Sequence, residues 1–172
     1  MPAPAILLSC VARAAVKHLG NFLTFGLAGD ILIDAWDAYQ SEAQTETQRR
    51  REVEALAAAT PAEARQVAKT VVAAVGGHLS PEDRQRLEDV LAQAPAAIRR
   101  SLRSPADPAG RSMSPARRLA GAKDLGAVMP LAPVRFKVGD RPAGVGDWQL
   151  EELLGVGGYG EVWRRATTTS RR

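Results

Sequence analysis

The sequence from residue 60 to residue 94 is TPAEARQVAKTVVAAVGGHLSPEDRQRLEDVLAQA, and it holds two helix starts in a row. At the first start, Thr60 can cap the helix, a proline fits the first turn, and Glu63 completes a capping box. Ser80 and Pro81 repeat the signal. Each start leads into apolar residues at helical spacing, which predicts two amphipathic helices that each bury one face.

Two earlier runs of apolar residues have the same helical spacing. The first covers residues 5–19 and is predicted to end at Gly20, and the second covers residues 28–39. Because amphipathic helices need each other to bury their apolar faces, residues 1–103 are predicted to form a small helical bundle. The predicted fold class is therefore mainly α.

The composition changes after this predicted bundle. Seven of the eleven prolines lie between Pro95 and Pro142. Residues 1–98 hold 9 Lys/Arg against 12 Asp/Glu, whereas residues 99–172 hold 14 against 7, so the second half of the chain is basic. A charged, proline-rich segment buries too little apolar surface to offset its ordering entropy. Residues 104–145 are therefore predicted to be a disordered Pro/Arg-rich linker.

Several kinds of partner are not predicted. No aromatic residues lie among the arginines between Arg99 and Lys123, as single-strand binding needs, so no specific nucleic-acid partner is expected. A single cysteine, Cys10, excludes an internal disulfide and a Cys-cluster zinc site, and no metal site is expected. Asp30 and Asp34 interrupt the most apolar stretch, which argues against a membrane span. The expected location is cytoplasmic.

The last part of the chain switches to the spacing of a strand. Trp148 and Leu150 alternate with polar residues, and residues 155–163 are GVGGYGEVW. This pattern predicts a strand, a glycine-rich turn and a second strand. The glycines at 155, 157 and 160 form a G-x-G-x-x-G motif, which alone fits more than one kind of nucleotide-binding loop.

Three interpretations of the glycine motif compete. A dinucleotide-binding fold needs a helix after the third glycine and an acidic residue about 20 positions later. A P-loop needs Gly-Lys-Ser/Thr, which the sequence lacks. The third kind of loop needs a valine two positions after the last glycine, an aromatic residue at the tip and strands on both sides. Val162 and Tyr159 meet these requirements.

Residues 148–163 resemble the first two strands of a protein kinase, and in particular the eukaryotic-type serine/threonine kinases of bacteria. Residues 136–148 are similar to the segment that precedes the kinase domain in long, multidomain members of that group. The resemblance implies ATP with Mg as the cofactor and phosphoryl transfer to a protein hydroxyl as the parent activity. It also implies these nucleotide-contacting positions: Leu154, Gly155, Val156, Gly157, Gly158, Tyr159, Gly160 and Val162.

The kinase pattern stops after these two strands. A kinase next needs a Val-Ala-x-Lys strand, and later His-Arg-Asp and Asp-Phe-Gly. After Val162 the sequence continues WRRATTTSRR, and it contains none of these motifs. No catalytic residue is assigned, and the chain is expected to be inactive and not to bind ATP tightly.

The resulting hypothesis is an N-terminal fragment of a serine/threonine kinase, ended early by truncation, frameshift or a misplaced stop. Residues 1–103 would be a helical module, residues 104–145 a flexible linker, and residues 146–172 the truncated start of a kinase domain, beginning as a β-hairpin. The alternative hypothesis is a non-catalytic helical module that interacts with an unknown protein partner.

Overall fold

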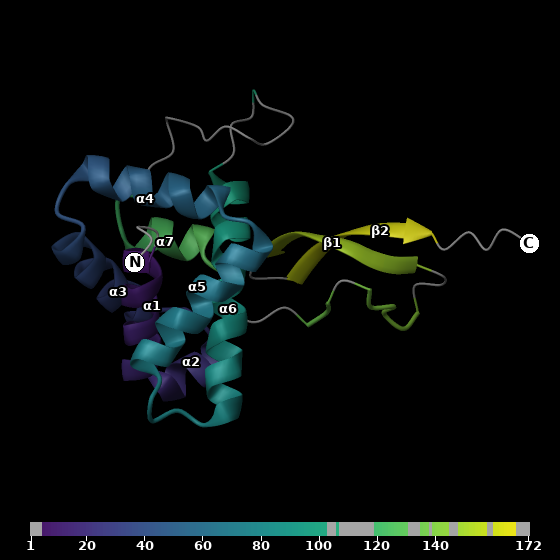
Figure 1. The fold of residues 1–172 in the computed structure, drawn as a ribbon, viewed down its shortest axis with the longest axis horizontal. Coiled ribbons are helices and arrows are strands. Elements are labelled where there is room, and N and C mark those ends of the chain that lie inside the picture. The colour runs from purple at the N-terminus through teal and green to yellow at the C-terminus, as the bar shows by residue number, and fades with distance from the viewer. Residues whose placement is uncertain are drawn as a thin grey trace, which may run out of the picture. The chain divides into compact units, whose positions relative to one another are not determined.

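The computed structural model divides into two compact units, residues 1–133 and residues 134–172, each of which is described by itself (Figure 1). The residues that the structure describes are 5–102, 106, 119–130, 135–137, 139–144, 148–157 and 160–167. Within them, the first unit is helical and the second contains a two-stranded antiparallel sheet. The predicted mainly α class with a C-terminal hairpin is confirmed.

The helices of the first unit pack around one hydrophobic core. The first helix contacts the third and the fifth, and the sixth contacts the fourth and the fifth. Their bounds are α1 (Ala5–Lys17), α2 (Leu19–Phe25), α3 (Asp30–Glu42), α4 (Glu46–Ala58), α5 (Pro61–Val75), α6 (Pro81–Ser101) and α7 (Ala122–Val128).

The two predicted helix starts are confirmed, each with its cap. The Thr60 hydroxyl accepts a hydrogen bond from the Glu63 N–H at 3.3 Å, and the Glu63 carboxylate accepts one from the Thr60 N–H at 2.8 Å. Ser80 accepts a bond from the Asp83 N–H at 3.1 Å, and Pro81 occupies the first turn of α6. These caps satisfy backbone donors that a helix end otherwise leaves unpaired.

The helix predicted to end at Gly20 is broken earlier and then continues. α1 ends at Lys17, and α2 runs through Gly20 at 99° to it. Phe22 of α2 is fully buried, and this burial outweighs the roughly 1 kcal/mol cost of glycine within a helix. Among the described residues no single helix has the length and apolarity to cross a membrane, whereas the bent α1–α2 pair passes that test jointly.

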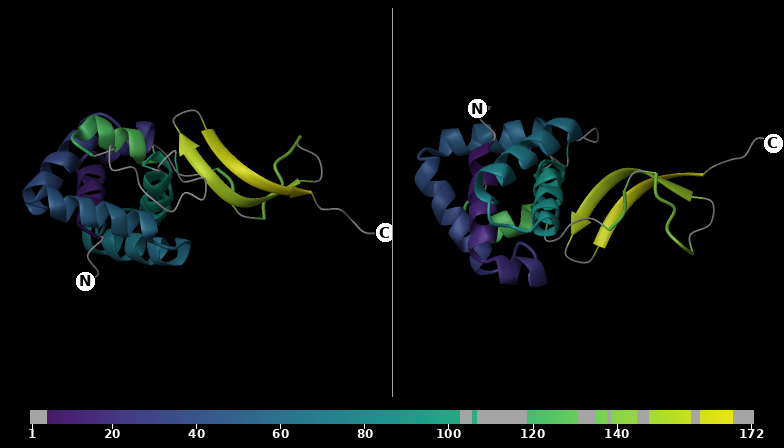
Figure 2. Two further views of the ribbon diagram at one scale, coloured as in Figure 1. Left: turned by 90° about the horizontal axis from the view of Figure 1, so that it is seen from above. Right: turned by 60° about the horizontal axis from the view of Figure 1, so that its bottom comes forward.

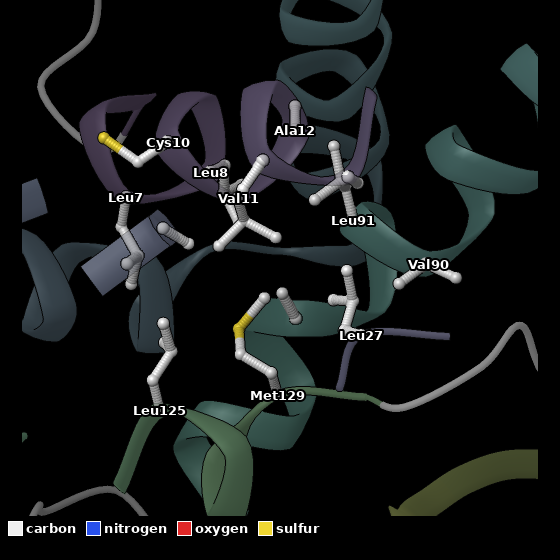
Figure 3. Close-up of a cluster of buried hydrophobic side chains, with 14 of the residues drawn as sticks. Leu7, Leu8, Cys10, Val11, Ala12, Leu27, Val90, Leu91, Leu125 and Met129 are labelled. Atoms are coloured by element: carbon white, nitrogen blue, oxygen red, sulfur yellow. The ribbon is translucent and has the colours of Figure 1, made fainter. Parts of the chain in front are cut away.

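The structure differs from the predicted linker at residues 122–130. This segment contains α7, which packs against α3 and α6. Leu125 is fully buried, and Met129 is only 4% exposed. Figure 3 shows both side chains directed into the cluster that Leu8 and Val11 of α1 form with Leu91 of α6. The remainder of the predicted linker up to residue 118 lies outside the described residues, except for Ala106.

Candidate functional site

The glycine motif lies on an antiparallel hairpin. The strands are β1 (Trp148–Gly157) and β2 (Gly160–Thr167), and their pairing ends with Gly157 opposite Gly160 (Figure 2). The two residues that join the strands, Gly158 and Tyr159, lie outside the described residues. The two predicted strands are confirmed, and the predicted turn falls on these two residues.

The hairpin brings most of the predicted nucleotide-contacting positions together at the turn. Gly155 is paired with Val162, and Val156 with Glu161. The next pair toward the turn is Gly157 with Gly160. Of residues 152–157 and of Gly160 only the backbone is described. The backbone therefore places the glycines on both strands, directly beside the turn.

β1 carries one extra residue at two points, so that the register shifts relative to β2. These extra residues are Glu151, between Leu150 and Glu152, and Leu154, which precedes the first glycine. Such bulges bend a strand and increase its twist, and they are common beside functional sites. The bulge at Leu154 thus re-aims the strand where it enters the glycine motif.

The two faces of β2 have different surroundings. Successive side chains of a strand point to opposite faces, so Glu161 and Trp163 share one face while Val162 lies on the other. The Val162 side chain is exposed, at 59% of its full accessible area. Glu161 is bound on its own face, where the Trp163 indole Nε1–H donates to its Oε2 at 2.8 Å.

A segment before the hairpin contacts both strands. This lead-in segment comprises residues 135–137 and 139–144 (Figure 2). Its Gly139 N–H donates to the Leu150 carbonyl at 2.7 Å, and the Leu150 N–H donates to the Asp140 carbonyl at 2.9 Å. The backbone N–H groups of Arg135 and Phe136 donate to the Glu161 carboxylate. The sequence predicts a disordered linker up to residue 145, and these bonds correct that prediction for residues 135–137 and 139–144.

The basic side chains of β2 engage the neighbouring strand. Arg164 lies 3.5 Å from the Glu151 carboxylate, and the Arg165 guanidinium lies over the ring of Trp148. The ion pair is exposed, and such pairs contribute about 0–1 kcal/mol. A cation over an aromatic ring at an exposed site contributes a similar amount, about 0.5–1 kcal/mol. Both contacts tie the strands together away from the turn.

The helical unit contains a buried carboxylate, a feature often found in active sites, but here the carboxylate has a structural role. Glu52 of α4 is 4% exposed, and its Oε1 accepts a bond from the Leu7 N–H in the first turn of α1 at 2.8 Å. Burial raises its pKa. The same carboxylate raises the pKa of Tyr39, whose own burial is the larger cause. Glu52 thus caps α1 from a neighbouring helix, where a carboxylate suits the helix dipole.

Cys10 and Asp34 of the helical unit each bond to basic side chains. Burial raises the pKa of the Cys10 thiol, which accepts a bond from Arg13 at 3.2 Å. Asp34 binds His18 at 2.7 Å and Lys17 at 2.6 Å. In the part of the chain that the structure describes, no group of three or more His, Cys, Asp or Glu residues could hold a metal ion.

Comparison with models of protein families, with curated proteins and with solved structures finds no match for this chain. The features of this chain that bear on its function are the residues of the glycine motif and the geometry of the hairpin that carries them.

Proposed function

We propose that residues 148–163 are the glycine-rich nucleotide loop of a serine/threonine protein kinase, whose activity is ATP-dependent protein phosphorylation. The observation that best supports this proposal is that Gly160 opens a strand. In dinucleotide-binding folds and P-loops the glycines lead into a helix, whose N-terminus binds the phosphates. In protein kinases the glycine-rich loop instead covers the phosphates from a hairpin.

Each part of the hairpin has a role in this proposal. Glycines without side chains let the backbone approach the triphosphate and offer N–H groups to its oxygens. Val162 is exposed on the face that the lead-in segment leaves free, and it would form part of the apolar roof over adenine. Leu154 would border the same pocket from its bulge. Tyr159, at the tip, would cover the phosphates and exclude water.

Mg-ATP would supply the transferable phosphoryl group when bound. Affinity and chemistry also need a lysine on the next strand, the residues that hold the metal, and a catalytic aspartate. Residues 1–172 contain none of the motifs that carry them. We therefore assign nucleotide-contacting positions but no catalytic residue, and we propose a cytoplasmic location, where ATP is available.

The DNA that follows codon 172, read in all three frames, tests this function. We expect one frame to encode Val-Ala-x-Lys roughly 10–20 codons beyond Val162, followed by His-Arg-Asp and Asp-Phe-Gly, because these elements complete a kinase domain. Expression of that frame joined to codon 163 should yield a protein that binds Mg-ATP. Three frames that all lack these motifs would contradict the proposed function.

A further inference from the structure

We propose that the lead-in segment, here called the strap, stabilises the hairpin by bonding to both strands. Glu161 is the residue that fixes the strap to β2. The strap holds β2 at the residue that directly follows the last glycine of the motif. This support consists of contacts among the described residues of the lead-in segment and the two strands. Its consequence for a nucleotide loop rests on the proposed function.

At the β1 end, the strap is fixed by main-chain hydrogen bonds. Both polar backbone groups of Leu150 bond to Gly139 and Asp140, and the Gln149 side chain donates to the Gly139 carbonyl at 3.2 Å. The strap turns tightly here, because the Asp140 carboxylate accepts a bond from the Lys137 N–H at 2.8 Å. Gly139 has φ +94°, a conformation that side chains rarely allow, so the turn depends on this glycine.

At the β2 end, the strap is fixed by a single carboxylate. Glu161 accepts bonds from two successive backbone N–H groups, those of Arg135 and Phe136, and also from the indole of Trp163. Bonds to a charged acceptor are about twice as strong as bonds between neutral groups. Because one side chain gathers these donors, removing its carboxylate should release this end of the strap.

The strap supports the hairpin from one face and leaves the opposite face open. A two-stranded hairpin alone is marginally stable in water, so a third segment bonded to both strands adds order that the pair lacks. The strap meets the face that Glu161 shares with Trp163, whereas Val162 points to the opposite face. The strap therefore orders the strand after the glycine turn without covering the face proposed for the nucleotide.

The proposal predicts that loss of the Glu161 carboxylate frees both the strap and the hairpin. In the full chain without nucleotide, Glu161→Ala should accelerate amide hydrogen exchange at residues 135, 136 and 150 about tenfold or more. The indole N–H of Trp163 should lose protection with them. Glu161→Gln, which keeps an acceptor, should give an intermediate rate. Glu151→Ala, which removes only an exposed ion pair of the hairpin, should change the rates at residues 135 and 136 far less than Glu161→Ala does.

A second variant releases the strap from its other end. Gly139→Val is strained at φ +94°, and it should accelerate exchange at the same amides while leaving Glu161 in place. Unchanged exchange in Glu161→Ala, or a response to Gly139→Val that stops short of residues 135 and 136, would overturn the proposal. Because no nucleotide is present, these outcomes are independent of whether the hairpin belongs to a kinase.

Discussion

Replacing Leu125 with alanine is expected to lower the free energy of unfolding of the helical unit by about 2–5 kcal/mol. Leu125 is fully buried, and α7 brings it into the core between α3 and α6. Truncation would leave a cavity in the core and remove apolar contacts. Urea denaturation followed by far-UV circular dichroism measures the change.

Lys123→Ala is the matched control, because Lys123 lies in the same helix but is exposed. Its effect should stay within about 0.5 kcal/mol. If Leu125→Ala were as mild as this control, residues 122–130 would not belong to the folded core. The segment would then be part of the linker that its composition first indicated.

The second large effect is expected at the buried carboxylate of α4. Glu52→Ala should lower the free energy of unfolding by about 1–3 kcal/mol, because the Leu7 N–H would lose its partner inside the protein. Glu52→Gln is the matched control, since it keeps an acceptor oxygen and removes only the charge. Equal stability of the alanine variant and the wild type would contradict the capping role of Glu52.

The pH dependence of stability separates the charge of Glu52 from its hydrogen bond. Burial raises the pKa of Glu52, so the folded protein keeps this proton to a higher pH than the unfolded chain. Its contribution therefore declines as the pH rises from the unfolded to the folded pKa. Asp34 behaves in the opposite way. Lys17 and His18 lower its pKa, so the stability that these two contacts provide is lost as the pH falls.

Glu52→Gln should remove the loss of stability that Glu52 causes as the pH rises. It should leave the loss of stability that Asp34 causes as the pH falls. The measurement is the free energy of unfolding of the wild type and Glu52→Gln across pH 4 to 8, a range that begins near the ordinary pKa of a glutamate, about 4.3. The difference between the two proteins should grow in favour of the glutamine variant as the pH rises. A difference that does not change with pH would show that Glu52 titrates alike in the folded and unfolded states.

Local signals in the sequence were sufficient for some parts of this fold. The starts of α5 and α6 are set by Thr60 and Ser80, whose side chains bond to backbone groups three residues away. The glycine turn of the hairpin is also local. Such features depend on neighbouring residues, and a single sequence displays them directly.

The parts that the sequence did not predict depend on distant contacts. α2 and α7 are short, and burial of Phe22 and Leu125 in a core built by other helices holds them in place. The Glu161 carboxylate bonds to backbone N–H groups that lie 25 and 26 positions earlier in the chain. An acidic residue directly after the third glycine is a visible signal, but nothing in the sequence indicates its partners.

If residues 148–163 are a kinase-type glycine-rich loop, they should work in place of the same segment in an active kinase. The measurement is kcat/KM for ATP of an active bacterial serine/threonine kinase in which these residues replace its own first two strands. A chimera in which Gly155, Gly157 and Gly160 are all replaced by valine serves as the matched control, because it keeps the strands and blocks approach of the backbone to the phosphates.

We expect the glycine chimera to keep kcat/KM within about tenfold of the parent kinase, a cost of about 1.4 kcal/mol in transition-state stabilisation. The valine control should fall well below it. If the glycine chimera folds with the melting temperature of the parent but is no more active than the valine control, the hairpin is not a kinase nucleotide loop.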